Sequence, residues 1–176
     1  MQNIITYGIF DTRIGQIVIG RSEVGLCWLG WMTEGYKGNG LNRMKEHFPK
    51  ADFVQDDAKT KPIMDAIMDA WDNDDISDIT MDIHGTEFQK SVWNALLDIP
   101  KGTTCTYGDV ANAIQKPKAS RAVGSAVGEN PISLLIPCHR VVQSTGALGN
   151  YGWGVGVKEN LLKLEAENVA HSVQAA

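Results

Sequence analysis

The apolar residues change their spacing part of the way along the chain, and this change limits the folds that the chain can adopt. In residues 1–31, short apolar runs alternate with turn residues, which predicts three antiparallel strands joined by tight turns. Later apolar residues recur at helical spacing, as Val92, Trp93 and Leu96 do. Strands followed by helices predict an α/β fold, and 176 residues suffice for one ordinary domain or two small ones.

The predicted elements follow one another with few long connections. Helices are expected near residues 41–48 and 63–71, followed by an acidic loop, a short strand at 79–84 and a helix over 88–97. Thr106 and Asp109 are spaced as a capping box for a short helix. A second short helix is expected from Ala119 to Gly128, so the pair is a helix-turn-helix candidate. Its small residues fit either close packing in a core or close approach to a flat partner.

Composition and charge restrict the classes of protein to which the chain can belong. The net charge is −5, but residues 1–84 hold 8 Lys/Arg against 14 Asp/Glu, whereas residues 85–176 hold 8 against 7. The second part can therefore carry a local anion-binding face on an acidic protein. Apolar runs are too short to cross a membrane, and no secretory signal is recognised. Three cysteines without a CxxC pair favour a reducing, cytoplasmic setting.

Residues 134–142, LLIPCHRVV, place three polar side chains inside an apolar run that resembles a buried strand. A thiolate is the nucleophilic form of cysteine, and Arg140 and His139 are placed to favour that form of Cys138. His139 could take the proton through a bridging water, and Glu159 in the last helix is a candidate to orient it. Cys27 and Cys105 are interpreted as ordinary buried thiols.

These segments resemble the O6-alkylguanine-DNA alkyltransferase family, also called methylated-DNA–protein-cysteine methyltransferases. The resemblance runs from Gly85 to Glu165 and is strongest in PCHRV, at residues 137–141. The other matching segments, in the order of the family, are GTEFQKSVW, KGTTCTYGDVA, KASRAVGSAVGENP, GALGNYGWG and a KxxLLxxE helix. Residues 1–83 resemble the more variable amino-terminal domain of the family.

The resemblance implies a particular division of the chain. Residues 1–83 would form an α/β domain with a ribonuclease-H-like sheet, and residues 84–168 a mostly helical active-site domain with a winged helix-turn-helix. Residues 169–176 would form a tail. The implied partner is double-stranded DNA, with the helix of Arg121 in its minor groove and Arg121 filling the place of the flipped nucleotide. The other residues implied to contact DNA are Ser120, Ala122, Gly124, Tyr151 and Gly152.

The resemblance also implies the reaction, a direct and irreversible transfer of the alkyl group from O6-alkylguanine to Cys138. O4-alkylthymine is a further possible substrate. His139, through water, and Glu159 would hold the thiolate, while the hydroxyl of Tyr107 would protonate the departing base near N3. Four further positions would complete the site: Asn130 bracing the active-site turn, the Val141 carbonyl reading the exocyclic amine, and a backbone N–H of Tyr151 or Gly152 near O6.

No regenerating step is visible, so one transfer per molecule is expected. The resemblance implies a monomer that works without a cofactor or a metal ion, and the chain lacks the cysteine-rich regulatory module of inducible relatives, which favours a stand-alone repair protein. Two other functions are kept open. The first is a lesion-binding DNA sensor that performs no transfer, and the second is a Cys-His hydrolase that turns over an acyl substrate.

Overall fold

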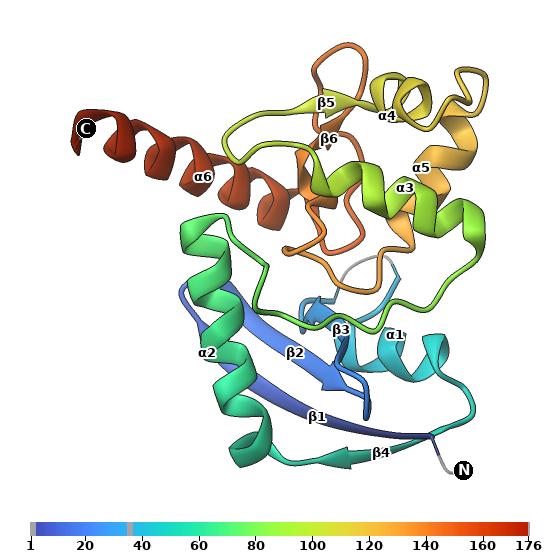
Figure 1. Ribbon diagram of the computed structural model, residues 1–176, viewed down its shortest axis with the longest axis vertical. Coiled ribbons are helices and arrows are strands. Elements are labelled where there is room, and N and C mark those ends of the chain that lie inside the picture. The colour runs from blue at the N-terminus through green and yellow to red at the C-terminus, as the bar shows by residue number, and fades with distance from the viewer. Residues whose placement is uncertain (1–2, 35–36, 176) are drawn as a thin grey trace. The chain divides into compact units, whose positions relative to one another are not determined.

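The computed structural model describes residues 3–34 and 37–175, and these form two compact units. The first comprises Met1–His84 together with Pro131–Leu135, and the second comprises Gly85–Asn130 together with Ile136–Ala176. Figure 1 follows the chain through both units. The expected boundary after residue 83 lies beside the change of unit at Gly85. However, residues 131–135, expected in the second domain, belong to the first unit.

The first unit is built on a sheet with the strand order β3-β2-β1-β4 (Figure 1). Strands β1 (Asn3–Thr12), β2 (Gly15–Arg21) and β3 (Leu26–Trp31) are antiparallel neighbours, which confirms the predicted meander. Gly15 opens β2 at a φ of 111°, a conformation that favours glycine. The sequence analysis did not predict β4 (Ala51–Gln55), which pairs parallel to β1.

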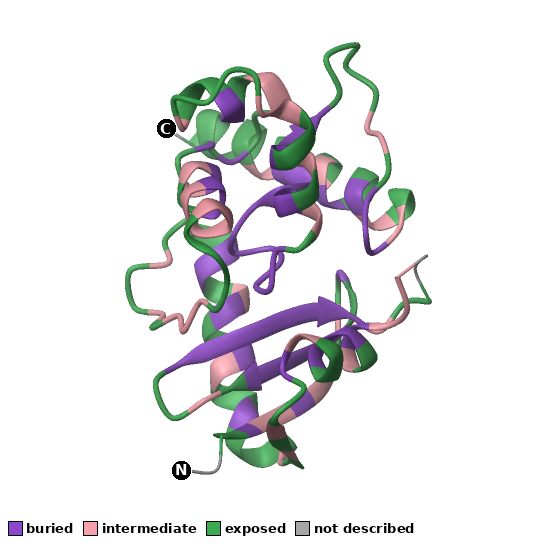
Figure 2. Ribbon diagram, turned by 90° about the vertical axis from the view of Figure 1, so that its right-hand side faces the viewer, coloured by how far each residue is buried: buried purple, intermediate pink, exposed green. Residues whose placement is uncertain are grey.

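Two helices of the first unit accompany this sheet, α1 (Gly40–His47) and α2 (Asp57–Asn73). Asn39 and Asp56 cap them by accepting hydrogen bonds from backbone N–H groups in the first turn. Strands β2 and β3 carry most of the buried residues of the sheet (Figure 2). The strand expected at 79–84 is wrong, because only Met81 forms an isolated bridge, to Leu26.

The second unit contains α3 (Glu87–Leu97), β5 (Cys105–Thr106), α4 (Tyr107–Ala113), α5 (Ser120–Gly128), the 3₁₀ helix η1 (Cys138–Arg140), β6 (Val141–Val142) and α6 (Val155–Ala175). The predicted capping box at α4 is present, with reciprocal bonds between Thr106 and Asp109. Thr86 and Gln89 form a second one at α3. The buried stripe of α3 is the predicted one, and Trp93 donates from Nε1 to the Ala126 carbonyl of α5 at 2.8 Å.

Two expectations about secondary structure late in the chain are wrong. Residues 169–176 were expected to form a tail, but α6 continues to Ala175, because no glycine or proline interrupts its last turns. The apolar run before Pro137 is not a strand. It forms turns in which Leu134 has a φ of 75°, and Ser133 donates its backbone N–H to the Leu29 carbonyl.

No helix among residues 3–34 and 37–175 has the length and apolar character that crossing a membrane requires. Within the same described ranges, no group of three or more His, Cys, Asp or Glu side chains is placed to hold a metal ion.

Candidate active site and nucleic-acid interface

Cys138 opens the 3₁₀ helix η1 directly after Pro137, and its side chain is buried, with 3% of the residue exposed. Its sulfur lies 3.5 Å from the hydroxyl of Tyr151, which is also buried. The backbone N–H of Cys138 donates to the Ile136 carbonyl at 2.7 Å. This amide is therefore used within the turn and is not directed at the sulfur.

The other two cysteines have the character of unreactive thiols. Burial raises the pKa of Cys27 to about 12, and the nearby charge of Asp82 adds to the shift. Burial also raises the pKa of Cys105, which is only half-buried, with a further contribution from Asp109. Both cysteines stay protonated at neutral pH, in agreement with their interpretation as ordinary thiols.

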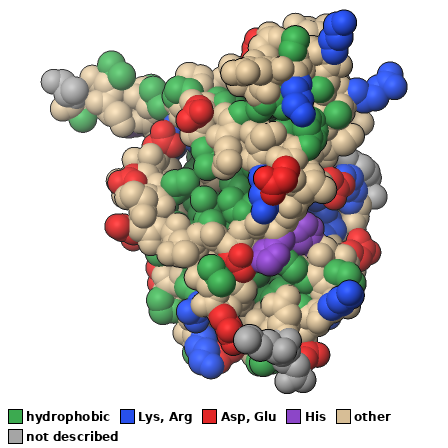
Figure 3. Space-filling model, turned by 45° about the vertical axis from the view of Figure 1, so that its right-hand side comes forward, with side chains coloured by type: hydrophobic (Ala, Val, Ile, Leu, Met, Phe, Trp, Pro, Cys, Tyr) green, Lys and Arg blue, Asp and Glu red, His purple; other side chains and the backbone are tan. Residues whose placement is uncertain are grey.

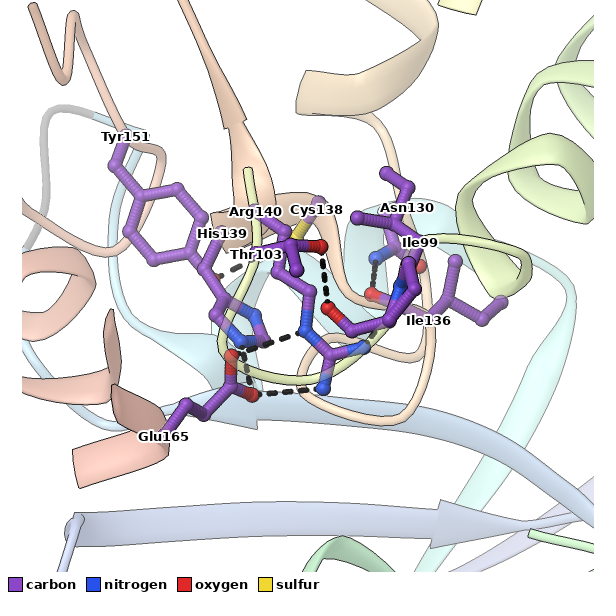
Figure 4. A network of polar contacts seen from close by, with 10 residues as sticks. Ile99, Thr103, Asn130, Ile136, Cys138, His139, Arg140, Tyr151 and Glu165 are labelled. Atoms are coloured by element: carbon purple, nitrogen blue, oxygen red, sulfur yellow. Dashed lines mark hydrogen bonds and ion pairs between the residues drawn. The ribbon is translucent and has the colours of Figure 1, made fainter. Parts of the chain in front are cut away.

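The carboxylate that contacts His139 is Glu165, and the expectation of Glu159 is wrong. Nε2 of His139 lies 2.8 Å from Oε1 of Glu165, and both side chains are fully buried (Figure 4). Glu159 is exposed on α6. The helix explains the difference, because Lys158, Leu161 and Glu165 form its buried face. Glu159 lies roughly 100° around the helix from Lys158 and therefore points away from that face.

Arg140 does not direct its guanidinium to Cys138 but to Glu165 and to the loop after α3. Nε and Nη2 donate to the two oxygens of Glu165 at 3.0 and 2.9 Å, and Nη1 donates to the Ile99 carbonyl at 2.6 Å (Figure 4). Burial alone would raise the pKa of Glu165. The hydrogen bonds and charges of His139 and Arg140 outweigh it and hold this pKa well below its usual range.

The ionisation of this buried cluster makes the protein sensitive to acid. The folded-state pKa of Glu165 is lowered, and burial lowers that of His139, so the unfolded chain takes up both protons first as pH falls. We expect protonation of His139 to reduce the free energy of unfolding below about pH 6.5, and protonation of Glu165 to reduce it below about pH 4.3. Between pH 7 and 5, urea titrations should show a smaller loss of unfolding free energy for His139→Gln than for the wild type. The exposed control His171→Gln should keep the wild-type loss, and equal losses in all three proteins would contradict the assignment.

Lys158 is a functional candidate that the sequence analysis missed. Its Nζ is buried on α6 and donates to the carbonyls of Val141 at 2.6 Å and Leu148 at 2.7 Å. It also lies 5.7 Å from the ring centre of Tyr151. Burial lowers the pKa of Lys158, partly offset by its interaction with Cys138. Two turns of one helix thus supply a cation on the Cys138 side and the carboxylate for His139, at positions seven residues apart.

We expect Lys158→Met to lower the free energy of unfolding by about 1–3 kcal/mol, because the Val141 and Leu148 carbonyls lose a buried donor. Lys163→Met is the matched control, since Lys163 is exposed on the same helix and should change stability by less than about 0.5 kcal/mol. Urea unfolding of both variants measures the difference. Equal stabilities would show that the hydrogen bonds of Lys158 to the Val141 and Leu148 carbonyls do not stabilise the fold.

Asn130 occupies the position expected of a brace. It is 2% exposed, and its Nδ2 donates to the Ile136 carbonyl at 2.7 Å, two residues before Cys138 (Figure 4). Val141 is fully buried, and its carbonyl is already an acceptor for Lys158. Gly152 is buried beside Tyr151 in the chain. The structure therefore gathers Asn130, Val141 and Tyr151 around the turn that holds Cys138.

The remaining expected residues lie on or beside a surface pocket of about 490 Å³ lined by α4, α5 and the segment after β6. Its lining residues are Thr106, Tyr107, Gly108, Ser120, Arg121, Gly124, Gln143, Ser144 and Thr145. Arg121 and Ala122 are exposed near the start of α5, and a Cβ on Gly124 would lie 3.8 Å from the Tyr107 ring. Figure 3 shows Lys and Arg side chains at the upper end of the view, where α4 and α5 lie in Figure 1. Gln143, Ser144 and Thr145 were not predicted.

The fold and the site define the class, a mixed α/β protein in which a buried cysteine precedes a buried histidine–glutamate contact, in the same unit as two short helices that present an exposed arginine. The family model described as "6-O-methylguanine DNA methyltransferase, DNA binding domain" matches residues 87–167. A methylated-DNA–protein-cysteine methyltransferase of Methanosarcina acetivorans is 40% identical over 161 residues, which cover 90% of this chain and 97% of that protein.

Longer relatives and solved structures agree with this match. The bifunctional transcriptional activator/DNA repair enzyme Ada of Escherichia coli is 38% identical over 93% of this chain, although the chain spans only 46% of that protein. Mycobacterium tuberculosis OGT in complex with DNA has a TM-score of 0.76 and 33% identity, over 93% of this chain and 94% of that one. The chain therefore belongs to the methylated-DNA–protein-cysteine methyltransferase family of DNA repair enzymes.

Proposed function

We propose that the chain transfers the alkyl group of O6-alkylguanine in double-stranded DNA to the sulfur of Cys138. The bond between O6 and the alkyl carbon breaks, and a bond between that carbon and Sγ forms. The observation that carries the proposal is the buried contact between Glu165 and His139, the residue that directly follows Cys138, since this contact supplies a base with an orienting carboxylate.

The proton leaves Cys138 through His139. Nε2 of His139 is engaged with Glu165, whereas Nδ1 is buried and makes no hydrogen bond within residues 3–34 and 37–175. Nδ1 can therefore accept the thiol proton through one water molecule, and Glu165 then stabilises the imidazolium that forms. Lys158 interacts electrostatically with Cys138, so the site also holds a buried cation from α6.

The leaving group needs its own stabilisation, because the departing guanine develops negative charge at O6 and N3. We assign the N3 proton to the hydroxyl of Tyr107, at the pocket beside α5, and Tyr107 then regains, through water, the proton that Cys138 gave to His139. The hydrogen bond to O6 is assigned to a backbone N–H of Tyr151 or Gly152. Fixed donors at the atoms where charge develops lower the barrier of such a step. The Val141 carbonyl would accept from the exocyclic amine with the lone pair that Lys158 leaves available.

DNA would bind through α4 and α5 as the helix-turn-helix of a winged domain, with the ribonuclease-H-like sheet in the first unit. The two helices are short and joined by residues 114–119, and the small side chains of α5 allow a close approach to the minor groove. The exposed Arg121 would fill the space of a flipped nucleotide, and Ser120, Ala122 and Gly124 accompany it on the same helix.

We expect Arg121→Ala to slow transfer from duplex DNA by about tenfold or more, because unstacking a base costs a few kcal/mol that Arg121 would offset. Single-stranded DNA carrying the same lesion needs less unstacking, so the variant should react with it nearly as the wild type does. Single-turnover rates on both substrates measure the ratio. Arg21→Ala, an exposed arginine of the first unit, is the control. An equal loss on both substrates would remove the role in flipping.

The reaction would occur once per molecule. The product is a thioether, and the transfer needs no second subunit, because one chain supplies the nucleophile, the base and the DNA-binding helices. We therefore infer a monomeric, cytoplasmic protein that acts stoichiometrically. A duplex carrying O6-methylguanine, compared with one carrying N7-methylguanine, tests the substrate. Base analysis should show loss of the methyl group from O6 only, and removal of neither or of both would contradict the proposal.

A further inference from the structure

Glu165 is shared between two donors in a fixed pattern. Arg140 contacts both of its oxygens, through Nε to Oε2 at 3.0 Å and Nη2 to Oε1 at 2.9 Å. His139 contacts only Oε1, at 2.8 Å. The third guanidinium nitrogen, Nη1, donates to the Ile99 carbonyl and so fixes the plane of the guanidinium (Figure 4). All three side chains are buried, which leaves their charges poorly screened by solvent.

This pattern determines where the hydrogen atoms lie. Arginine remains protonated in proteins, and a carboxylate held by a two-pronged arginine stays ionised and can only accept hydrogen bonds. The hydrogen in the contact between His139 and Glu165 must then come from Nε2 of the imidazole. A neutral imidazole with its hydrogen on Nε2 has a lone pair on Nδ1.

Charge balance favours the neutral imidazole over the imidazolium. Arg140 and Glu165 already neutralise one another, so a proton on His139 would leave an excess positive charge in a buried cluster. The charged groups that act on His139 are Glu165 and Lys158 from α6 and Arg140 from η1. Burial lowers the pKa of His139, Glu165 opposes this shift, and both cations reinforce it.

We propose that Arg140 is a positioning residue that keeps His139 neutral, with its hydrogen on Nε2 and the Nδ1 lone pair available to accept a proton. This inference rests on the proposed function for its purpose, since Nδ1 is the atom that would receive the proton of Cys138. A purely structural role for Arg140, as a brace between η1, α6 and the loop after α3, predicts no particular protonation state of His139.

The test is nitrogen-15 NMR of the free protein with labelled histidine, recorded without DNA. The chain has 4 histidines, and the His139→Gln spectrum identifies the resonances of His139. We expect the wild type at neutral pH to show one protonated and one unprotonated ring nitrogen, with the hydrogen on Nε2. An imidazolium, or a hydrogen on Nδ1, would overturn the inference without any variant of Arg140.

Two variants then separate charge from packing. Arg140→Gln removes the cation, so the titration midpoint of His139 should rise by about one pH unit or more. Arg140→Lys keeps the cation and should hold the midpoint near the wild-type value, although the two-pronged contact is lost. A folded Arg140→Gln protein with an unchanged midpoint would overturn the inference.

The NMR result and the transfer assay fail independently. A wild type that shows the Nε2 form but never accepts a methyl group would contradict the proposed function and leave the role of Arg140 intact. A wild type that transfers the methyl group with His139 in another form would do the opposite.

Discussion

Replacing Cys138 by alanine is expected to abolish methyl transfer completely while leaving the binding of damaged duplex DNA within a few-fold of the wild-type value. In the proposed reaction the Cys138 sulfur is the methyl acceptor, whereas the residues that line the α4–α5 pocket do not include Cys138. Transfer is measured as methyl lost from the oligonucleotide, and binding as the dissociation constant at fixed salt.

Cys105→Ala is the matched control for this prediction, because Cys105 belongs to the same unit and is also a free thiol. It should transfer at the wild-type rate. Residual transfer in Cys138→Ala would show that another residue is the nucleophile. A wild type that binds the lesion as tightly as Cys138→Ala and transfers nothing would instead be the lesion-binding sensor.

Glu165→Gln is expected to slow transfer by about 10²-fold or more, because a glutamine cannot stabilise the imidazolium that forms on His139. The same change removes the negative charge that balances Arg140, so an uncompensated buried cation remains. Single-turnover rates at saturating DNA separate this loss from weaker binding. Circular dichroism checks that the variant is folded at the temperature of the assay.

Glu159→Gln is the discriminating control, since it makes the same chemical change six residues earlier on α6, at an exposed position. It should transfer at the wild-type rate. If Glu159→Gln were slow and Glu165→Gln fast, the relay would run through the residue first expected from the sequence, and the geometry described for His139 would not be the active one.

These two glutamates illustrate what the sequence can and cannot predict about the site. The motif around Cys138 identifies His139 from the sequence. Which carboxylate reaches His139 depends on which residues of α6 face the interior. Lys158, Leu161 and Glu165 share one face because positions three and seven apart come round to the same side of a helix. The spacing of Lys158, Leu161 and Glu165 in the sequence is compatible with one helix face. Because lysine and glutamate are mostly exposed in proteins, the spacing alone does not predict that this face is buried.

The fold likewise has parts that the sequence predicts and parts that it does not. Local signals suffice for the β1–β3 meander and for the capping box of α4, because turns and caps are set by neighbouring residues. Parallel pairing of β4 with β1, and the return of residues 131–135 to the first unit, depend on contacts distant in sequence. No periodicity within these short segments encodes such contacts.

The proposed reaction is a single irreversible transfer to one sulfur, and its direct test is a measurement of the intact mass of the protein. The protein is mixed with an excess of duplex DNA carrying O6-methylguanine, and the adduct is then mapped by peptide fragmentation. Each molecule is expected to gain one methyl group, located on Cys138, with no further loss of methyl from the DNA. Demethylation of more than one equivalent of DNA, or a methyl group on Cys27 or Cys105, would contradict the proposed reaction.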